Sequence, residues 1–558
     1  MKKLICLLFA ISVATLLSAK ELPKEPSVIT GKLENGFTYE IKQNSKPKEI
    51  AEFRLVVKAG SLEEDDDQKG LAHFVEHMAF NGSKNFKKNE LIQYLESIGV
   101  SFGSHLNAST SYERTLYQLS VPVRNNNLEK SFLIFKDWAD GLVFDKEAFE
   151  AERGVILEEA RSRDTVNYRL FRKTKDMKYA NSKYLEREPI GDLDIVRNVP
   201  VQRAIDFYND WYRPNLMHFV AVGDFNTTKI ESLIKEYFSE LTNRSTRQPA
   251  SRSIPENNST RIRIVTDPET TSNFLDITFI ENLDKLKTEK DLRQSLVESM
   301  MTALFNMKAS EQILKANTKA KRIYMRGMAI GESRGGYKFV AHYNGLDELA
   351  ALNELYALIW SFDKHGFSDG DLALIKKRLS SANESRYKRI KSQKSSTIAS
   401  ALANAYLSGS TYVDYEVLYS LHKRFIDEIA LADINNKFKK IVALQDKAII
   451  FVNSTGNQVA KRKILSTIKE ARKNIENFSL EKELPTKLLF NTLVPKKMMK
   501  KQYHKKFDYH EYLLANGIRV AFKQMDYNKR RIEMKGFSEG GISVYELNDL
   551  NDSRSASR

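Results

Sequence analysis

The stretch LENGFTY, residues 33 to 39, has the pattern of a strand, an Asn-Gly turn and the start of a second strand. The same pattern returns as LANGIRV at residues 514 to 520, an offset of 481 residues. In both copies another glycine follows the turn glycine after 24 residues, so the similarity extends beyond the turn. An internal repeat at a fixed offset indicates that the chain starts the same domain more than once.

Strand and helix signals alternate along the chain between these two copies, which is typical of mixed α and β domains. The first stretch ends in the buried strand pattern MHFVAVG, residues 217 to 223, and the second in KAIIFV, residues 447 to 452. We therefore predict an α+β fold of tandem homologous αβ domains. Each is expected to contain a mostly antiparallel sheet with helices packed on one face.

Composition sets the expected boundaries. Residues 242–260 are rich in Asn, Ser, Thr and Arg, and residues 481–510 are rich in Lys, so both stretches have the character of linkers. The expected segments are a signal peptide (1–19), a first domain with a zinc site (25–241), a second homologous domain without one (261–478), a basic linker (481–510) and the truncated start of a third homologous domain (511–558).

The first nineteen residues resemble a secretory signal peptide, with Lys2-Lys3, an apolar run over residues 4–17 and small residues up to Ala19. That run is too short to span a bilayer comfortably, and no later run approaches eighteen residues, so we expect no transmembrane anchor. The only cysteine, Cys6, lies inside the leader. The mature protein is therefore expected to be exported and free of cysteine, in the periplasm or, as the alternative, outside the cell.

The chain is basic, with 88 Lys and Arg against 72 Asp and Glu and a net charge of +16. A basic balance can indicate an acidic partner, but the lysines are spread along the chain without a nucleic-acid motif. We expect no nucleic-acid partner.

The candidate chemistry lies in GLAHFVEHMAF, residues 70 to 80. His73 and His77 are four residues apart, so on a helix they present their imidazoles on one face. Two histidines and a carboxylate form a common catalytic zinc set with one position left for water. Glu76 flanks that face and can act as the general base, and His-x-x-Glu-His is the signature of the inverted zincins.

A third ligand is expected from EAERGVILEEARSR, residues 150 to 163, which has a helical pattern. Glu152 and Glu159 are seven residues apart and share a helix face, whereas Glu158 lies about 100° around the axis from Glu159. Buried carboxylates need a cation or a hydrogen-bonding partner. The acidic run at residues 63–67 is instead expected to cap the motif helix.

Four motifs resemble the pitrilysin/insulinase family of zinc endopeptidases, in particular its exported bacterial branch, the PqqL-like zinc proteases. They are GLAHFVEHMAFNGS, LNASTSYERT, ERGVILEE and FYNDWYRPN followed by VAVGDF, and they occur in the order of the family. The resemblance covers residues 25 to 558 and implies four homologous αβ domains in two halves that close over peptides.

The resemblance also implies the roles of single residues. His73, His77 and Glu159 would bind one Zn²⁺ per chain, with Glu76 as the general base and Glu152 as an acidic residue that supports the catalytic site. Asn107 and Ala108 match an edge strand on which family members bind the substrate peptide by β-augmentation.

The sequence departs from the family pattern in one respect, and this leaves more than one function open. The repeat that begins at LANGIRV ends about fifty residues into the third domain. The chain is expected to be a fragment of a longer product, or to require a complementary C-terminal half or a homo-oligomeric partner. A zinc-dependent endopeptidase is the main hypothesis. A catalytically inactive fragment, a non-catalytic peptide-binding subunit and a protein with structural zinc are the alternatives.

Overall fold

A computed structural model describes residues 20–314, 318–456, 459–473, 475–478, 494–525 and 532–540. The predicted leader, residues 1–19, lies outside these ranges. The chain forms two compact units, residues 1–481 and 482–558, which are described separately. In the described ranges no helix is long and apolar enough to cross a membrane.

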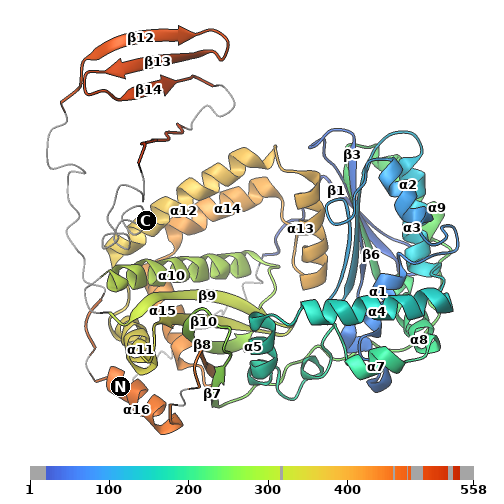
Figure 1. Cartoon of the computed structure of the whole chain (residues 1–558), viewed down its shortest axis with the longest axis horizontal. Helices are drawn as coiled ribbons and strands as arrows, with labels where there is room; N and C mark the ends of the chain where they lie inside the picture. The colour runs from blue at the N-terminus through green and yellow to red at the C-terminus, as the bar shows by residue number, and fades with distance from the viewer. Residues whose placement is uncertain are drawn as a thin grey trace, which may run out of the picture. The chain divides into compact units, whose positions relative to one another are not determined.

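The first sheet has six strands in the order β1-β2-β6-β3-β5-β4. Figure 1 labels β1, β3 and β6 of this sheet. Every neighbouring pair is antiparallel except β2 and β6, which run parallel. The strands are β1 (Val28–Lys32), β2 (Thr38–Gln43), β3 (Ile50–Val57), β4 (Leu106–Thr110), β5 (Thr115–Pro122) and β6 (Met217–Gly223).

The second sheet has five strands in the order β7-β11-β8-β10-β9, with β7 and β11 parallel and all other pairs antiparallel. The strands are β7 (Thr260–Thr266), β8 (Asn273–Asn282), β9 (Ala320–Ile330), β10 (Arg334–Tyr343) and β11 (Lys447–Asn453). If β7 to β11 are matched in chain order to β2 to β6, the strand order of the second sheet equals the order β2-β6-β3-β5-β4 in the first sheet. The predicted α+β fold of tandem domains with one topology is confirmed.

Each sheet buries one face under helices of its own half. Phe53 of β3 packs there against Phe132 of α3 and Phe219 of β6. The helices of the first half are α1 (Leu71–Met78), α2 (Glu90–Ser97), α3 (Asn127–Asp140), α4 (Lys146–Ser162), α5 (Val166–Thr174), α6 (Asp176–Tyr179), α7 (Leu193–Asn198), α8 (Val201–Trp211) and α9 (Thr227–Phe238). Those of the second are α10 (Glu289–Ile313), α11 (Glu348–His365), α12 (Asp369–Ile390), α13 (Ser395–Ser408), α14 (Tyr415–Glu428), α15 (Leu431–Ala443) and α16 (Lys461–Ala471).

Helices of each half also cover the sheet of the other half. The opposite face of the first sheet, at Val56 and Val220, is covered by α13 of the second half through Ile398 and Leu402 (Figure 1). The opposite face of the second sheet packs in turn against α5 and α6 of the first half. The second face of each sheet is therefore covered by helices from the other half, α13 for the first sheet and α5 and α6 for the second.

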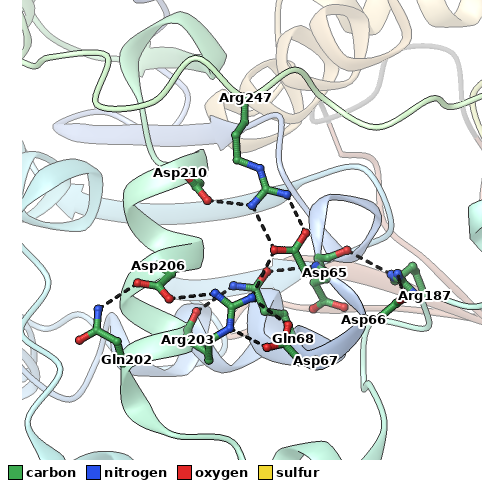
Figure 2. Close-up of polar contacts among 11 residues, drawn as sticks. Asp65, Asp66, Asp67, Gln68, Arg187, Gln202, Arg203, Asp206, Asp210 and Arg247 are labelled. Atoms are coloured by element: carbon green, nitrogen blue, oxygen red, sulfur yellow. Dashed lines mark hydrogen bonds and ion pairs between the residues drawn. The ribbon is translucent and has the colours of Figure 1, made fainter.

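The segment between the two sheets, predicted as a linker, has no helix or strand before β7 but is firmly attached. Arg247 in this segment binds Asp65 (Nη2–Oδ1 2.6 Å), and Arg203 of α8 binds Asp67 (Nη2–Oδ1 2.8 Å; Figure 2). Glu64 accepts hydrogen bonds from the backbone N–H groups of Gly70 (3.0 Å) and Ala72 (2.9 Å) at the start of α1. The acidic run at residues 63–67 thus caps α1 through Glu64, as expected, and its ion pairs with Arg203 and Arg247 are a further role that the sequence did not predict.

The second unit contains a three-stranded antiparallel sheet of β12 (Met498–His504), β13 (Tyr509–Leu514) and β14 (Arg519–Phe522). The pairing of His510 with Phe522 is the pairing of Ile29 with Ile41 shifted by 481 residues. Residues 498–504 were expected to belong to a basic linker, but they form β12. Exposed lysines are common on edge strands, so a Lys-rich segment does not exclude a strand.

Candidate active site

Helix α1 is fixed at its start by Gly70 and by the capping carboxylate of Glu64. Gly70 has a φ of +105°, and a Cβ there would lie 2.8 Å from Cγ2 of Val196 and 3.2 Å from Cα of Gly191. Only glycine adopts this conformation without strain and fits this space. The constraint sets the position of the helix that carries His73, Glu76 and His77.

Three side chains converge beside α1. Nε2 of His73 lies 3.2 Å from Nε2 of His77. Oε2 of Glu159, on α4, lies 3.5 Å from His73 Nε2 and 3.4 Å from His77 Nε2. Within the described ranges this is the one group of His, Cys, Asp and Glu whose potential ligand atoms converge closely enough to hold a metal ion.

The spacing of these three atoms fits a tetrahedral ion. Donor atoms 2.0–2.1 Å from a shared tetrahedral Zn²⁺ are separated by about 3.3 Å. Oε2 of Glu159 is also buried and makes no hydrogen bond, and its ion-pair contacts are with the two histidine rings. A buried carboxylate oxygen that makes no hydrogen bond favours a cation at this point. Two imidazoles and one carboxylate are moreover a ligand set that zinc accepts.

Glu152 and Glu158 lie away from this point. Oε1 of Glu152 is 2.6 Å from Nδ1 of His77, on the far side of the ring from the converging atoms. Its Oε2 accepts a hydrogen bond of 2.8 Å from Asn81. Glu158 forms an exposed pair with Arg161. Glu152 therefore orients His77, as carboxylates commonly orient histidine ligands, and Glu158 has no part in the site.

Glu76 lies on α1 with its side chain buried and one oxygen held. Oε2 accepts a hydrogen bond of 2.6 Å from the hydroxyl of Thr110 on β4. Burial raises the pKa of the Glu76 carboxyl, and the Thr110 hydrogen bond opposes that rise. A carboxylate with a raised pKa beside a metal site is suited to accept and return a proton.

The charges of the site depend strongly on one another. Burial alone would lower the pKa of His77, but Glu152 and Glu159 outweigh burial and raise it to about 9. Burial and the positive charge of His77 lower the pKa of His73. The interaction with His77 lowers the pKa of Glu159. Without metal, the site thus holds a proton on His77 between two carboxylates.

Asn107 and Ala108 lie on β4, the edge strand of the first sheet. Backbone hydrogen bonds from Ser120 N to His105 O and from Ser111 N to Arg114 O tie β4 to β5 at alternate residues. The backbone N–H of Ala108 therefore faces the free edge. It donates to the side-chain Oδ1 of Asn107 at 2.9 Å. This edge can accept a further strand.

The sequence did not single out three residues that contact the site. Asn81 binds Glu152, Thr110 binds Glu76, and Arg163 forms an ion pair with Oε1 of Glu159. Arg163, at the end of α4, and Asn81, just beyond α1, each follow a site residue by four positions, a spacing that sequence alone supplies. Thr110 is 34 residues from Glu76 in the chain and carries no such signal.

Comparison with known proteins agrees with this architecture. Residues 40–184 match the model of the insulinase family, peptidase family M16, and residues 198–321 match that of the peptidase M16 inactive domain. The His-x-x-Glu-His pattern on α1 is the motif by which one class of zinc peptidases is recognised. The chain belongs to peptidase family M16, the insulinase family.

Named relatives make the likeness more specific. The chain is 30% identical over 542 residues to the probable zinc protease PqqL of Haemophilus influenzae, covering 96% of this chain and 58% of that protein. It is 31% identical to PqqL of Escherichia coli, covering 83% of this chain and 50% of that protein. The crystal structure of the first half of the periplasmic protease PqqL from Escherichia coli matches with a TM-score of 0.77 and 29% identity, covering 84% of this chain and all of that one. The chain spans about half the length of the curated relatives it matches.

Proposed function

We propose that the chain is the zinc-binding part of an endopeptidase that hydrolyses peptides or small unfolded proteins. His73, His77 and Glu159 would hold one Zn²⁺. The observation that carries the proposal is the spacing of their three donor atoms, 3.2 to 3.5 Å apart, with the buried carboxylate of Glu76 next to them on α1. Relatives named zinc proteases support the same metal.

Each residue of the proposed site would have a separate role in hydrolysis. When bound, the ion would lower the pKa of a water molecule and polarise the carbonyl of the scissile bond. Glu76 would take the proton of that water and deliver it to the leaving amine. The free edge of β4 at Asn107 and Ala108 would align the substrate as an added strand. Glu152 would act as a positioning residue through His77.

A pair of substitutions tests this mechanism. Glu76→Gln removes the base and no ligand, so zinc content should stay at one per chain while cleavage of a quenched peptide library falls by orders of magnitude. His77→Ala should lose both, because two remaining ligands hold zinc poorly. Zinc is measured by mass spectrometry of the dialysed protein. Glu76→Gln protein that cuts as fast as wild type would overturn the mechanism.

A second candidate is a non-catalytic peptide-binding subunit that acts with a complementary half, supported by the free edge of β4 and by a matching solved structure that is itself the first half of a longer protease. The experiment is therefore run on this chain alone and together with the segment that corresponds to the remaining length of its relatives. Zinc binding and peptide binding without cleavage in both preparations would favour the second candidate. Cleavage in either preparation would exclude it.

We also propose that the protein is exported to the periplasm. The leader pattern of residues 1–19 supports this, and the related Escherichia coli structure is described as a periplasmic protease. Export predicts mature protein that begins at Lys20 in the periplasmic fraction. Protein that keeps residues 1–19 and stays in the cytoplasmic fraction would contradict it.

A further inference from the structure

We propose that Thr110 is a positioning residue for the reaction: its hydroxyl fixes the carboxylate of Glu76 in the orientation that proton transfer requires. This inference rests on the proposed function, because it assigns Thr110 a role through Glu76. The contact that motivates it is the hydrogen bond of 2.6 Å from Thr110 Oγ1 to Glu76 Oε2. A hydroxyl that donates to a carboxylate at this distance makes one of the stronger hydrogen bonds of proteins.

The three carboxylates of the site are held in a common way. Glu152 accepts a hydrogen bond from Asn81 with Oε2 and contacts His77 Nδ1 with Oε1, and Glu159 pairs with Arg163 through Oε1 and with the two histidines through Oε2. In each, a neighbouring side chain holds one oxygen and the other oxygen contacts a histidine of the site. Glu76 resembles them in that Thr110 holds its Oε2, which leaves Oε1 for the attacking water.

Thr110 can hold Glu76 because its own position is fixed. It pairs directly with Thr115 across β4 and β5, with 3.4 Å between the two hydroxyl oxygens. Thr115 is fully buried and donates a hydrogen bond of 3.0 Å to the carbonyl of Ala59. A β-branched side chain also has few rotamers. The hydroxyl of Thr110 is therefore a rigid donor.

The same strand connects the base to the substrate. Thr110 follows Ala108 by two residues on β4, so both residues direct their backbone groups to the same free edge. A peptide that pairs with this edge at Ala108 is thus placed by the strand that places Glu76. This shared support fixes the distance between the scissile bond and the base, to which catalysis is sensitive on the scale of 1 Å.

Thr110 exchanges no proton in this scheme. Its O–H bond stays intact and donates to Oε2 throughout. Oε1 of Glu76 accepts one proton from the attacking water and returns it to the leaving amine, so the carboxylate is regenerated. The role is orientation, and the expected effect is on the rate of the chemical step.

The test compares Thr110→Val, Thr110→Ser and a matched control in the full-length gene product. Val keeps the shape of Thr and removes the hydroxyl, and we expect kcat to fall about 10- to 100-fold with KM changed less than about 3-fold. Ser keeps the hydroxyl and should restore most of the rate. Thr278→Val is the control, because Thr278 is a buried strand threonine that donates to a carboxylate, Asp276, far along the chain from the site.

Three further measurements test whether a lower rate in Thr110→Val comes from the orientation of Glu76. Zinc content should stay at one per chain in every variant, and a crystal structure of Thr110→Val should show the Glu76 carboxylate displaced, as the control should not. In the Glu76→Gln background, Thr110→Val should lower the rate no further. Unchanged kcat in Thr110→Val, or a change confined to KM, would overturn the inference. Wild-type protein whose activity does not depend on Glu76 would instead overturn the proposed function.

Discussion

His77 shows how one side chain couples the metal to the charge of the site. Glu152 and Glu159 hold its pKa at about 9, so a proton occupies the ring throughout the neutral range. Metal must displace that proton, because only the neutral ring binds zinc. In the proposed zinc site, the same carboxylates that orient His77 would therefore make metal binding dependent on pH.

We expect the apparent zinc affinity to rise about tenfold per pH unit between pH 6 and 8, as one proton is displaced below a pKa of about 9. Competition with a chelator at pH 6, 7 and 8 measures this slope. In Glu152→Gln the slope should flatten, because the pKa of His77 falls, while affinity at pH 8 drops about 10- to 100-fold. An affinity that does not change with pH in wild type would contradict the expectation.

The site could be predicted from sequence only in part. The spacing of His73 and His77 was sufficient to place both imidazoles on one face, because helix geometry fixes it. The choice of Glu159 over Glu152 as ligand came from the family resemblance, since both share one helix face, whereas helix geometry had set Glu158 apart. Thr110 could not be found, because its contact with Glu76 depends on where β4 lies beside α1.

At the level of secondary-structure elements, the start of α1 depends on one glycine. Gly70→Ala would strain the backbone at a φ of +105° and press a methyl group within 2.8 Å of Val196. We expect a loss of about 2–3 kcal/mol in the free energy of unfolding, measured by urea denaturation, and weaker zinc binding.

Gly154→Ala is the matched control on α4, where an added Cβ meets no heavy atom within 4 Å. It should increase the free energy of unfolding by about 0.5–1 kcal/mol, because glycine weakens a helix interior relative to alanine. Equal effects of the two substitutions would refute the role given to Gly70.

The exchange of helices between the two halves was not predictable from sequence. The apolar residues of α13 form a helical pattern that is the same whichever sheet they cover. Only the structure shows that Leu402 lies against Val220 of the first sheet. The alternation of strands and helices in both domains, in contrast, followed from signals that each half carries itself, whereas the strand order is known from the structure.

At the scale of the folded unit, residues 1–481, helices of each half cover the sheet of the other half. We therefore expect the two halves to unfold together. Leu402→Ala should lower the free energy of unfolding by about 2–4 kcal/mol and keep a single transition, since it removes buried contacts shared by both halves. Ser400→Ala, on the exposed side of α13, should change little. Two separate transitions in calorimetry of residues 20–478 would show that the halves are independent.

The side-chain contact of Asn107 with the N–H of Ala108 has a consequence outside catalysis. An uncovered edge strand is a template on which copies of a protein can polymerise into fibres. By occupying the outward N–H, Asn107 denies this template a hydrogen-bond donor until a peptide displaces the amide. In the proposed function, the strand would thus stay available to a substrate peptide while being less available to other copies of the protein, which would limit aggregation.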